Sequence, residues 1–145
     1  MAAFALAPRE GESDGMLISA DRNPNTTGAK LILGKNDPYQ AFDSIKQNVE
    51  SGSIKNLIVL NEDLVTDHGY AEEIFDKLDL LVSTNRLANP TASASDLVLP
   101  TTGFAEQSGT MVNVTGRLQK LNKAIDAPGQ AKSVFEILSA LITEL

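Results

Sequence analysis

Cysteine is absent from the 145 residues of this chain, and histidine occurs once. Without cysteine the chain has no disulfide and no thiolate nucleophile, and it carries no iron–sulfur cluster and no cysteine-bound zinc of its own. The lone histidine, His68, has no neighbouring partner to form a site, so we expect it to be exposed or to cap a helix. We therefore predict no metal site, and the lack of cysteine is compatible with a reducing compartment.

Positive charge is scarce as well. Lysine and arginine number 12 against 19 aspartates and glutamates, which gives a net charge of −7. An acidic protein repels phosphate backbones, so we expect no nucleic-acid partner. No apolar run approaches the ~20 residues that a membrane span needs, and residues 1–8 lack the basic start of a secretion signal. The sequence thus predicts a cytoplasmic protein without direct membrane insertion.

Short apolar runs alternate with amphipathic stretches along the chain. This alternation is typical of an α/β fold with an open, mainly parallel, Rossmann-like sheet and crossover helices. The apolar runs predict strands at residues 15–20, 56–61, 80–84 and 96–99. Helical spacing of apolar residues predicts helices at residues 25–34, 38–52 and 66–78, with a turn or short helix at 89–95.

The last part of the chain departs from this alternation. Residues 110–119 alternate in the manner of an extended segment, and residues 130–145 form an amphipathic closing helix by pattern. We expect a loose N-terminal arm over residues 1–14 and a single α/β domain over residues 15–145.

Neither a G-x-G-x-x-G fingerprint nor a phosphate-binding P-loop is present in the sequence. Open parallel sheets bind ligands in the crevice outside the carboxyl ends of their strands. The loops expected there are residues 60–64, 83–89 and 100–110, and their small residues and backbone N–H groups could hold phosphates. They could equally be plain surface connections, and the pattern leaves both interpretations open.

The stretch from residue 100 to residue 119 has only two charged groups, Glu106 and Arg117. A carboxylate and a guanidinium can form a two-pronged ion pair, which would fasten this irregular segment to the sheet. Gly109 and Gly116 would allow the backbone to turn with a positive φ. Together with Asn113 these residues form a predicted structural clasp that needs no catalysis.

Residues 96–119, DLVLPTTGFAEQSGTMVNVTGRLQ, resemble a block of the molybdopterin oxidoreductase superfamily. In that family a strand ending in A-D-x-V-L-P precedes a segment with E, G-T, N and G-R-x-Q at fixed spacing. The matching residues are Asp96, Val98, Leu99, Pro100, Glu106, Gly109, Thr110, Asn113, Gly116, Arg117 and Gln119. The sequence of residues 104–107 and 112–119 most resembles the large, molybdopterin-like subunit of NADH–quinone oxidoreductase, respiratory complex I.

The resemblance implies a non-catalytic structural module of such a large subunit, which supports electron transfer carried by other subunits. No activity and no cofactor are then expected of this chain alone. Its partners would be other subunits of a respiratory NADH dehydrogenase or a related oxidoreductase, which could hold it at the inner face of the membrane. A homo-oligomer is also compatible with the sequence.

The alternative is the nucleotide-binding part of a split oxidoreductase with a molybdopterin guanine dinucleotide cofactor. The resemblance then assigns cofactor contacts to Asn61, Asn85, Thr101, Thr102 and Glu106. Two departures count against it. Asn85 stands where cofactor-binding relatives often have an acidic residue, and Asn61-Glu62-Asp63 replaces an Asn-Pro turn, placing acidic groups where a pyrophosphate would lie.

Overall fold

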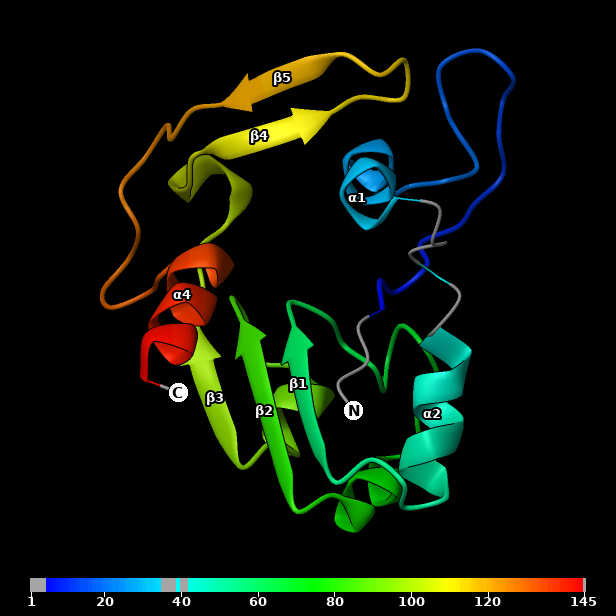
Figure 1. The fold of residues 1–145 in the computed structure, drawn as a ribbon, viewed down its shortest axis with the longest axis vertical. Coiled ribbons are helices and arrows are strands. Elements are labelled where there is room, and N and C mark those ends of the chain that lie inside the picture. The colour runs from blue at the N-terminus through cyan, green and yellow to red at the C-terminus, as the bar shows by residue number, and fades with distance from the viewer. Residues whose placement is uncertain (1–4, 35–38, 40–41, 145) are drawn as a thin grey trace. The chain divides into compact units, whose positions relative to one another are not determined.

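The structure is a computed structural model that describes residues 5–34, 39 and 42–144 (Figure 1). Its contacts divide the chain into two compact units. The first combines Met1–Ile45 with Gly109–Leu121, and the second combines Lys46–Ser108 with Asn122–Leu145. The predicted boundary between an arm and a domain at residue 15 stays a prediction.

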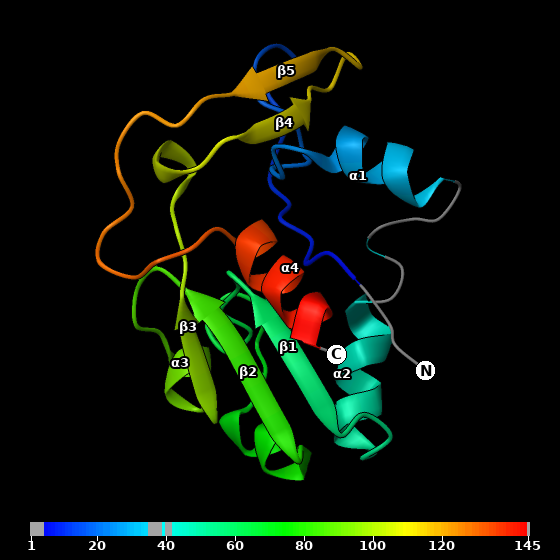
Figure 2. The same cartoon turned by 60° about the vertical axis from the view of Figure 1, so that its left-hand side comes forward.

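The second unit is built on a three-stranded parallel sheet in the order β1-β2-β3. Its strands are β1 (Asn56–Leu60), β2 (Leu80–Asn85) and β3 (Leu97–Pro100). In Figure 2 the three arrows point the same way, and the register places Val82 opposite both Ile58 and Leu97. The predicted α/β class with an open parallel sheet is therefore confirmed.

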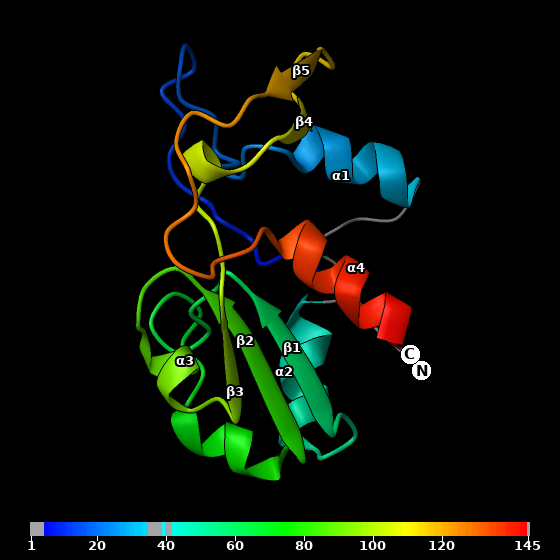
Figure 3. The same cartoon turned by 90° about the vertical axis from the view of Figure 1, so that its left-hand side faces the viewer.

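Helical segments lie on both faces of this sheet (Figure 3). The 3-10 helix η1 (Glu72–Lys77) and α3 (Pro90–Ser93) lie in the connections that follow β1 and β2, and α4 (Val134–Glu144) lies against the opposite face from α3. Val59, Leu81 and Phe75 are buried on the side of η1 and α3. β1 and β2 thus bury side chains on this face, whereas Ile58 and Leu80, on the other face, are 50% and 42% exposed.

Helix α2 (Phe42–Glu50) leads into β1. Its Val49 is fully buried, and Gly52 beyond its end has a φ of 74°, which glycine adopts without strain. The Lys77 Nζ donates to the Glu50 carbonyl at 2.6 Å, which ties the end of the helix to η1. The predicted helix over 38–52 is present here, although residues 38, 40 and 41 of that prediction lie outside the described residues.

The first unit contains α1 (Thr26–Leu33) and an antiparallel pair, β4 (Gly109–Val112) and β5 (Leu118–Leu121). Asn25, the N-cap residue of α1, accepts a hydrogen bond from the Val112 N–H through its side-chain oxygen at 2.8 Å. This bond joins α1 to β4 across 87 positions of sequence. The extended segment predicted for residues 110–119 is therefore two strands with a turn between them.

A polar cluster around Tyr39 also belongs to the first unit. The Tyr39 hydroxyl donates to Asp21 at 3.1 Å and lies 2.6 Å from the Thr26 hydroxyl. Burial raises the pKa of Asp21, but the hydrogen bonds from Thr26, Asn23 and Tyr39, together with the charge of Lys30, outweigh it and hold that pKa below its ordinary value. The carboxylate therefore stays charged and fixes the start of α1.

The strand predicted at residues 15–20 is wrong. Met16 and Leu17 are 86% and 89% exposed, at the end of a loop. The Asp14 carboxylate accepts the N–H groups of Met16, Leu17 and Ile18 at 2.7–2.9 Å. This local side-chain pairing takes the donors that a strand would offer to a neighbour. The parallel sheet consequently has three strands among the described residues rather than the four predicted.

The helix predicted over residues 66–78 is only partly present. Residues 64–68 form turns, and regular structure begins with η1 at Glu72. Gly69 has a φ of 63°, which breaks a right-handed helix at that point. Tyr70 and Ile74 are buried as their spacing predicted, so the apolar residues still reach the core.

Candidate functional site

The carboxyl ends of the three parallel strands lie along one edge of the sheet. Asn61, directly after β1, has a φ of 58° and donates its N–H to the Thr84 carbonyl at 2.8 Å. Thr101, directly after β3, donates its N–H to the Asn85 carbonyl at 3.2 Å. The backbone thus brings Asn61, Asn85 and Thr101, three of the residues predicted from the sequence, to adjoining strand ends.

Four buried polar atoms near this edge have no hydrogen-bond partner among the residues that the structure describes. They are Ser83 Oγ, Thr84 Oγ1, Asn85 Nδ2 and Thr101 Oγ1. The exposed fraction is 0% for Ser83, 1% for Thr84 and 4% for Thr101. An unsatisfied buried polar group costs about 1–3 kcal/mol, and native proteins have few of them. These atoms lie in the carboxyl-terminal half of β2 and directly after β3, where their partners would come from water, a ligand or another chain.

Ser83 and Thr84 were not singled out from the sequence. The signal that could have revealed them is the change within LLVSTN (80–85), where an apolar strand becomes polar halfway along. A buried parallel strand normally stays apolar to its end. A polar second half is thus a mark of a functional strand end.

The other two predicted contacts are engaged within the chain. Thr102 is buried, and its hydroxyl lies 3.5 Å from Gln107 Oε1, the outer limit of a hydrogen bond. Glu106 accepts the Gly103 N–H at 2.7 Å and so closes the start of the short 3-10 helix η2 (Phe104–Glu106). Asn85 and Thr101 therefore carry the candidate site, whereas Glu106 has a local structural partner.

The acidic turn after β1 is also engaged. Asp63 Oδ1 accepts the Thr91 hydroxyl at 2.8 Å and the Val65 N–H at 3.2 Å. Burial raises the pKa of Asp63, but the hydrogen bonds from Thr66 and Thr91 outweigh it and lower that pKa below its ordinary value. Glu62 Oε2 lies 3.5 Å from His68 Nε2. The carboxylates of Asp63 and Glu62 therefore both interact with groups of the chain itself.

The surroundings of His68 differ from those predicted from the sequence. Its side chain is only 9% exposed and lies beside Glu62, in the turns that follow β1. It is neither exposed nor the cap of a described helix, and its place beside a carboxylate accounts for its burial.

The residues of the predicted clasp are divided between the two compact units. Glu106 belongs to one compact unit and Arg117 to the other, so their ion pair stays a prediction. The Asn113 side-chain oxygen accepts the N–H groups of Thr115 and Arg117 at 3.1 and 2.8 Å, which shapes the turn between β4 and β5. Gly116 has a φ of 83° there. Gly109 does not have a positive φ, so that part of the prediction is wrong.

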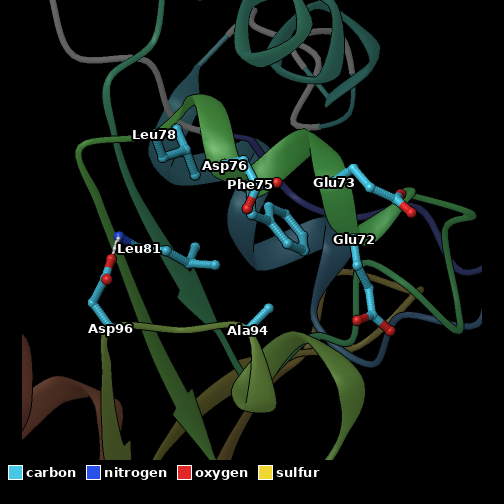
Figure 4. A pocket seen from close by; sticks show the side chains of 8 residues that line it. All are labelled: Glu72, Glu73, Phe75, Asp76, Leu78, Leu81, Ala94 and Asp96. Carbon is cyan, nitrogen blue, oxygen red and sulfur yellow. Dashed lines mark hydrogen bonds between the residues drawn. The ribbon is translucent and has the colours of Figure 1, made fainter.

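A cavity of about 420 Å³ lies elsewhere in the second unit (Figure 4). Its lining residues are Glu72, Glu73, Phe75, Asp76, Leu78, Leu81, Ala94 and Asp96. Asp96 precedes β3 and accepts the Leu81 N–H at 2.7 Å, so the cavity is at the amino ends of the strands. Ligands of open parallel sheets bind at the opposite edge, so we do not assign the cavity to the candidate site.

Residues 11–15, GESDG, match the G-x-S-x-G pattern of hydrolase nucleophiles. In hydrolases that serine lies on a sharp turn between a strand and a helix. Here Ser13 is in an exposed loop, and its Oγ donates to the Ile18 carbonyl at 2.8 Å. The setting is that of a loop-closing serine.

Within the described residues, no helix has both the length and the apolar character that crossing a membrane requires. Those residues likewise contain no group of three or more histidine and carboxylate side chains arranged to hold a metal ion.

The second unit is thus an open α/β sheet with buried, unpartnered polar atoms near the carboxyl ends of its strands, among the residues that the structure describes. The chain belongs to the molybdopterin oxidoreductase family, which it matches over residues 7–144. This confirms the family that residues 96–119 resemble.

The chain is similar to two named subunits in particular. It is 35% identical over 95 residues to the F420-dependent formate dehydrogenase 1 subunit alpha of Methanococcus maripaludis, covering 63% of this chain and 14% of that relative. It is 33% identical over 104 residues to the NADPH-Fe(3+) oxidoreductase subunit alpha of Geobacter sulfurreducens, covering 70% and 12%. The chain thus spans about an eighth of the length of these curated relatives. They are alpha subunits of formate and iron oxidoreductases and do not single out complex I.

Proposed function

We propose that this chain forms the nucleotide-holding part of the large subunit of a molybdopterin oxidoreductase. The carboxyl ends of β1, β2 and β3 would receive the dinucleotide portion of the cofactor. One observation carries the proposal: Asn85 Nδ2 and Thr101 Oγ1 are buried and lack hydrogen-bond partners among the described residues, and they stand on neighbouring strand ends.

The chemistry of these groups fits a nucleotide. The Asn85 amide offers N–H donors while its oxygen accepts from Asn89 Nδ2 at 3.1 Å, so its orientation is fixed. The Thr101 hydroxyl can donate and accept. We expect Asn85 and Thr101 to hold polar edges of the ligand, with Asn61 and Thr102 beside them. When bound, the metal-carrying pterin supplies the redox chemistry, and the protein supplies binding and orientation.

The acidic turn does not stand against this proposal. Asp63 bonds to Thr91 and Val65, and Glu62 lies beside His68. Hydrogen bonds from the chain partly offset the negative charge of a carboxylate, so it repels a neighbouring phosphate less strongly.

The test uses guanosine diphosphate as the probe. We expect it to raise the melting temperature of the wild-type protein in a concentration-dependent manner, because a ligand that binds only the folded state stabilises it. Thr101→Val should remove most of this shift. Without nucleotide the same variant should be as stable as wild type or more stable, because it removes an unpaired buried hydroxyl.

The control is Thr115→Val, which alters an exposed threonine in the β4–β5 turn and should leave the nucleotide-induced shift unchanged. Absence of any shift at millimolar nucleotide would overturn the proposal. So would a Thr101→Val variant that is destabilised without nucleotide and binds it like wild type.

A second candidate is a non-catalytic structural module of an NADH–quinone oxidoreductase large subunit. Glu106 favours it, because this predicted cofactor contact is occupied by the Gly103 N–H. Copurification with flavin- and iron–sulfur-containing subunits, without guanine nucleotide released on heating, would support this candidate. In both cases we propose a cytoplasmic location, partner subunits that carry the electrons, and no activity from this chain alone.

A further inference from the structure

A chain of hydrogen bonds fixes the orientation of the Asn85 side chain at the end of β2. The Ala92 N–H donates to Asn89 Oδ1 at 2.7 Å, and Asn89 is the N-cap residue of α3. Asn89 Nδ2 then donates to Asn85 Oδ1 at 3.1 Å. Asn85 Nδ2, at the end of this chain of bonds, is buried and has no hydrogen-bond partner among the described residues.

The direction of these hydrogen bonds follows from the backbone group at their start. A backbone N–H can only donate, so the atom of Asn89 that faces Ala92 has to be its oxygen. The amide nitrogen of Asn89 therefore faces Asn85, and only the oxygen of Asn85 can accept from it. Rotating either amide by half a turn would place two donors or two acceptors against each other. Asn85 consequently offers a donor on its unpaired side.

The surroundings favour an uncharged acceptor for this donor. The Asp63 carboxylate accepts the Thr91 hydroxyl at 2.8 Å, so it bonds to the same first turn of α3 that orients Asn89. A phosphate oxygen at Asn85 Nδ2 would place a second negative charge near this carboxylate, which is unfavourable even where hydrogen bonds weaken the repulsion. A carbonyl oxygen of a nucleobase accepts the same hydrogen bond without adding charge.

We infer that Asn85 selects the nucleobase by donating a hydrogen bond to the oxygen on carbon 6 of a purine, and that Asn89 is the positioning residue that imposes this direction. The inference rests on the proposed function, in which the carboxyl ends of the strands hold the nucleotide. An exocyclic oxygen projects beyond the ring, so it reaches a recessed amide better than the ring nitrogens do. The site should therefore accept 6-oxopurines and reject 6-aminopurines, whose amino group would face Asn85 with a second donor.

The test compares diphosphates that differ only in the base, by isothermal titration calorimetry with the purified chain. Inosine diphosphate keeps the 6-oxo group of guanosine diphosphate and lacks its 2-amino group, whereas 2,6-diaminopurine riboside diphosphate keeps the 2-amino group and has a 6-amino group instead. We expect inosine diphosphate to bind within about threefold of guanosine diphosphate, and the diaminopurine analogue to bind at least about tenfold more weakly. A diaminopurine analogue that binds as tightly as guanosine diphosphate would overturn the inference, and so would a tenfold loss for inosine diphosphate.

Asn89→Asp tests the direction of the bonds without changing Asn85. Aspartate caps a helix as well as asparagine does, so the Ala92 N–H keeps its acceptor. The second carboxylate oxygen then faces Asn85, whose amide should turn, donate to it and present its own oxygen to the ligand. The added charge acts on the same diphosphate in both ligands and cancels in the ratio of dissociation constants, diaminopurine analogue to guanosine diphosphate. This ratio should fall from at least about ten to below one, and an unchanged ratio would contradict the inference.

Asn48→Asp is the matched control, because it adds the same charge at an exposed position of α2 and should leave the ratio at its wild-type value. If Asn89→Asp does not fold, Asn85→Asp replaces it and should reverse the preference too, because its carboxylate still accepts from Asn89 and presents an acceptor to the ligand. Binding of guanosine diphosphate with an unchanged ratio rejects only the selection by Asn85. Absence of binding by all three nucleotides rejects the proposed function and this inference with it.

Discussion

At the scale of single residues, Asp63 shows how a loop side chain sets the geometry of the strand ends. Its Oδ1 accepts the Thr91 hydroxyl and the Val65 N–H, which connects the turn after β1 to the first turn of α3. We predict that Asp63→Asn lowers the free energy of unfolding by about 1–2 kcal/mol at neutral pH, because hydrogen bonds to a charged acceptor are stronger than those to a neutral one. Urea denaturation measures the difference.

This effect should depend on pH. The pKa of Asp63 is lowered in the folded state, so its contribution is complete above the unfolded value, 3.8, and is lost as the pH falls through the folded value. The stability difference between wild type and Asp63→Asn should therefore be constant from pH 7 to about 5 and shrink below about 4. Asp67→Asn, at an exposed position of the same turn, should show neither effect. A pH-independent difference would contradict this account.

Hydrogen bonding of individual residues is also where sequence reading failed. The apolar run GMLISA predicts a strand, and no pattern in it indicates that the Asp14 carboxylate accepts hydrogen bonds from the N–H groups of Met16, Leu17 and Ile18. The unpaired atoms of Thr84 and Thr101 are equally invisible, because an unsatisfied group is defined by what surrounds it in three dimensions. Asn85 and Thr101 could be predicted only through the family resemblance and their place after strands.

At the scale of elements, the β4–β5 turn depends on one glycine. Gly116 has a φ of 83°, a conformation that costs other residues about 1–2 kcal/mol. We predict that Gly116→Ala destabilises the protein by about this amount, measured as a loss of unfolding free energy in urea. In contrast, Gly109→Ala should be near neutral, because Gly109 has no positive φ and an added Cβ would meet no atom within 4 Å.

The opposite ranking of these two glycine variants would show that the clasp region is held at Gly109 instead. Both glycines belong to the family-like block, so resemblance alone cannot separate them. Only the backbone angle distinguishes a required glycine from a tolerated one.

The elements that the sequence predicted best are the strands with short continuous apolar runs. LIVL in β1 and LLV in β2 are such runs, and the structure places them in the parallel sheet, although Ile58 and Leu80 stay half exposed. The region from residue 66 to residue 78 has helical spacing as well, but Gly69 with its positive φ delays regular structure until η1. Periodicity reports which residues reach the core and is a weaker guide to which hydrogen-bond pattern joins them.

At the scale of the whole molecule, the parallel sheet of the second unit has two faces and two ends with different surroundings. One face carries η1 and α3, and the other carries α4. The carboxyl ends hold unpaired polar atoms of Asn85 and Thr101. Ligands of open parallel sheets bind outside the carboxyl ends of the strands, which is why the proposed nucleotide site lies at that end.

The two compact units should differ in local stability. β2 is the central strand of the parallel sheet, and Leu81, Ser83 and Thr84 are at most 1% exposed, whereas all of residues 11–20 are exposed and β5 is mostly so. Amide hydrogens open to exchange at a free energy that rises with such burial. We predict that in hydrogen–deuterium exchange followed by mass spectrometry, peptides from residues 80–85 exchange slowest, and peptides from residues 11–20 and 118–121 at least tenfold faster. Equal protection of β5 and β2 would contradict this prediction and would mean that the hairpin is buried against protein in solution.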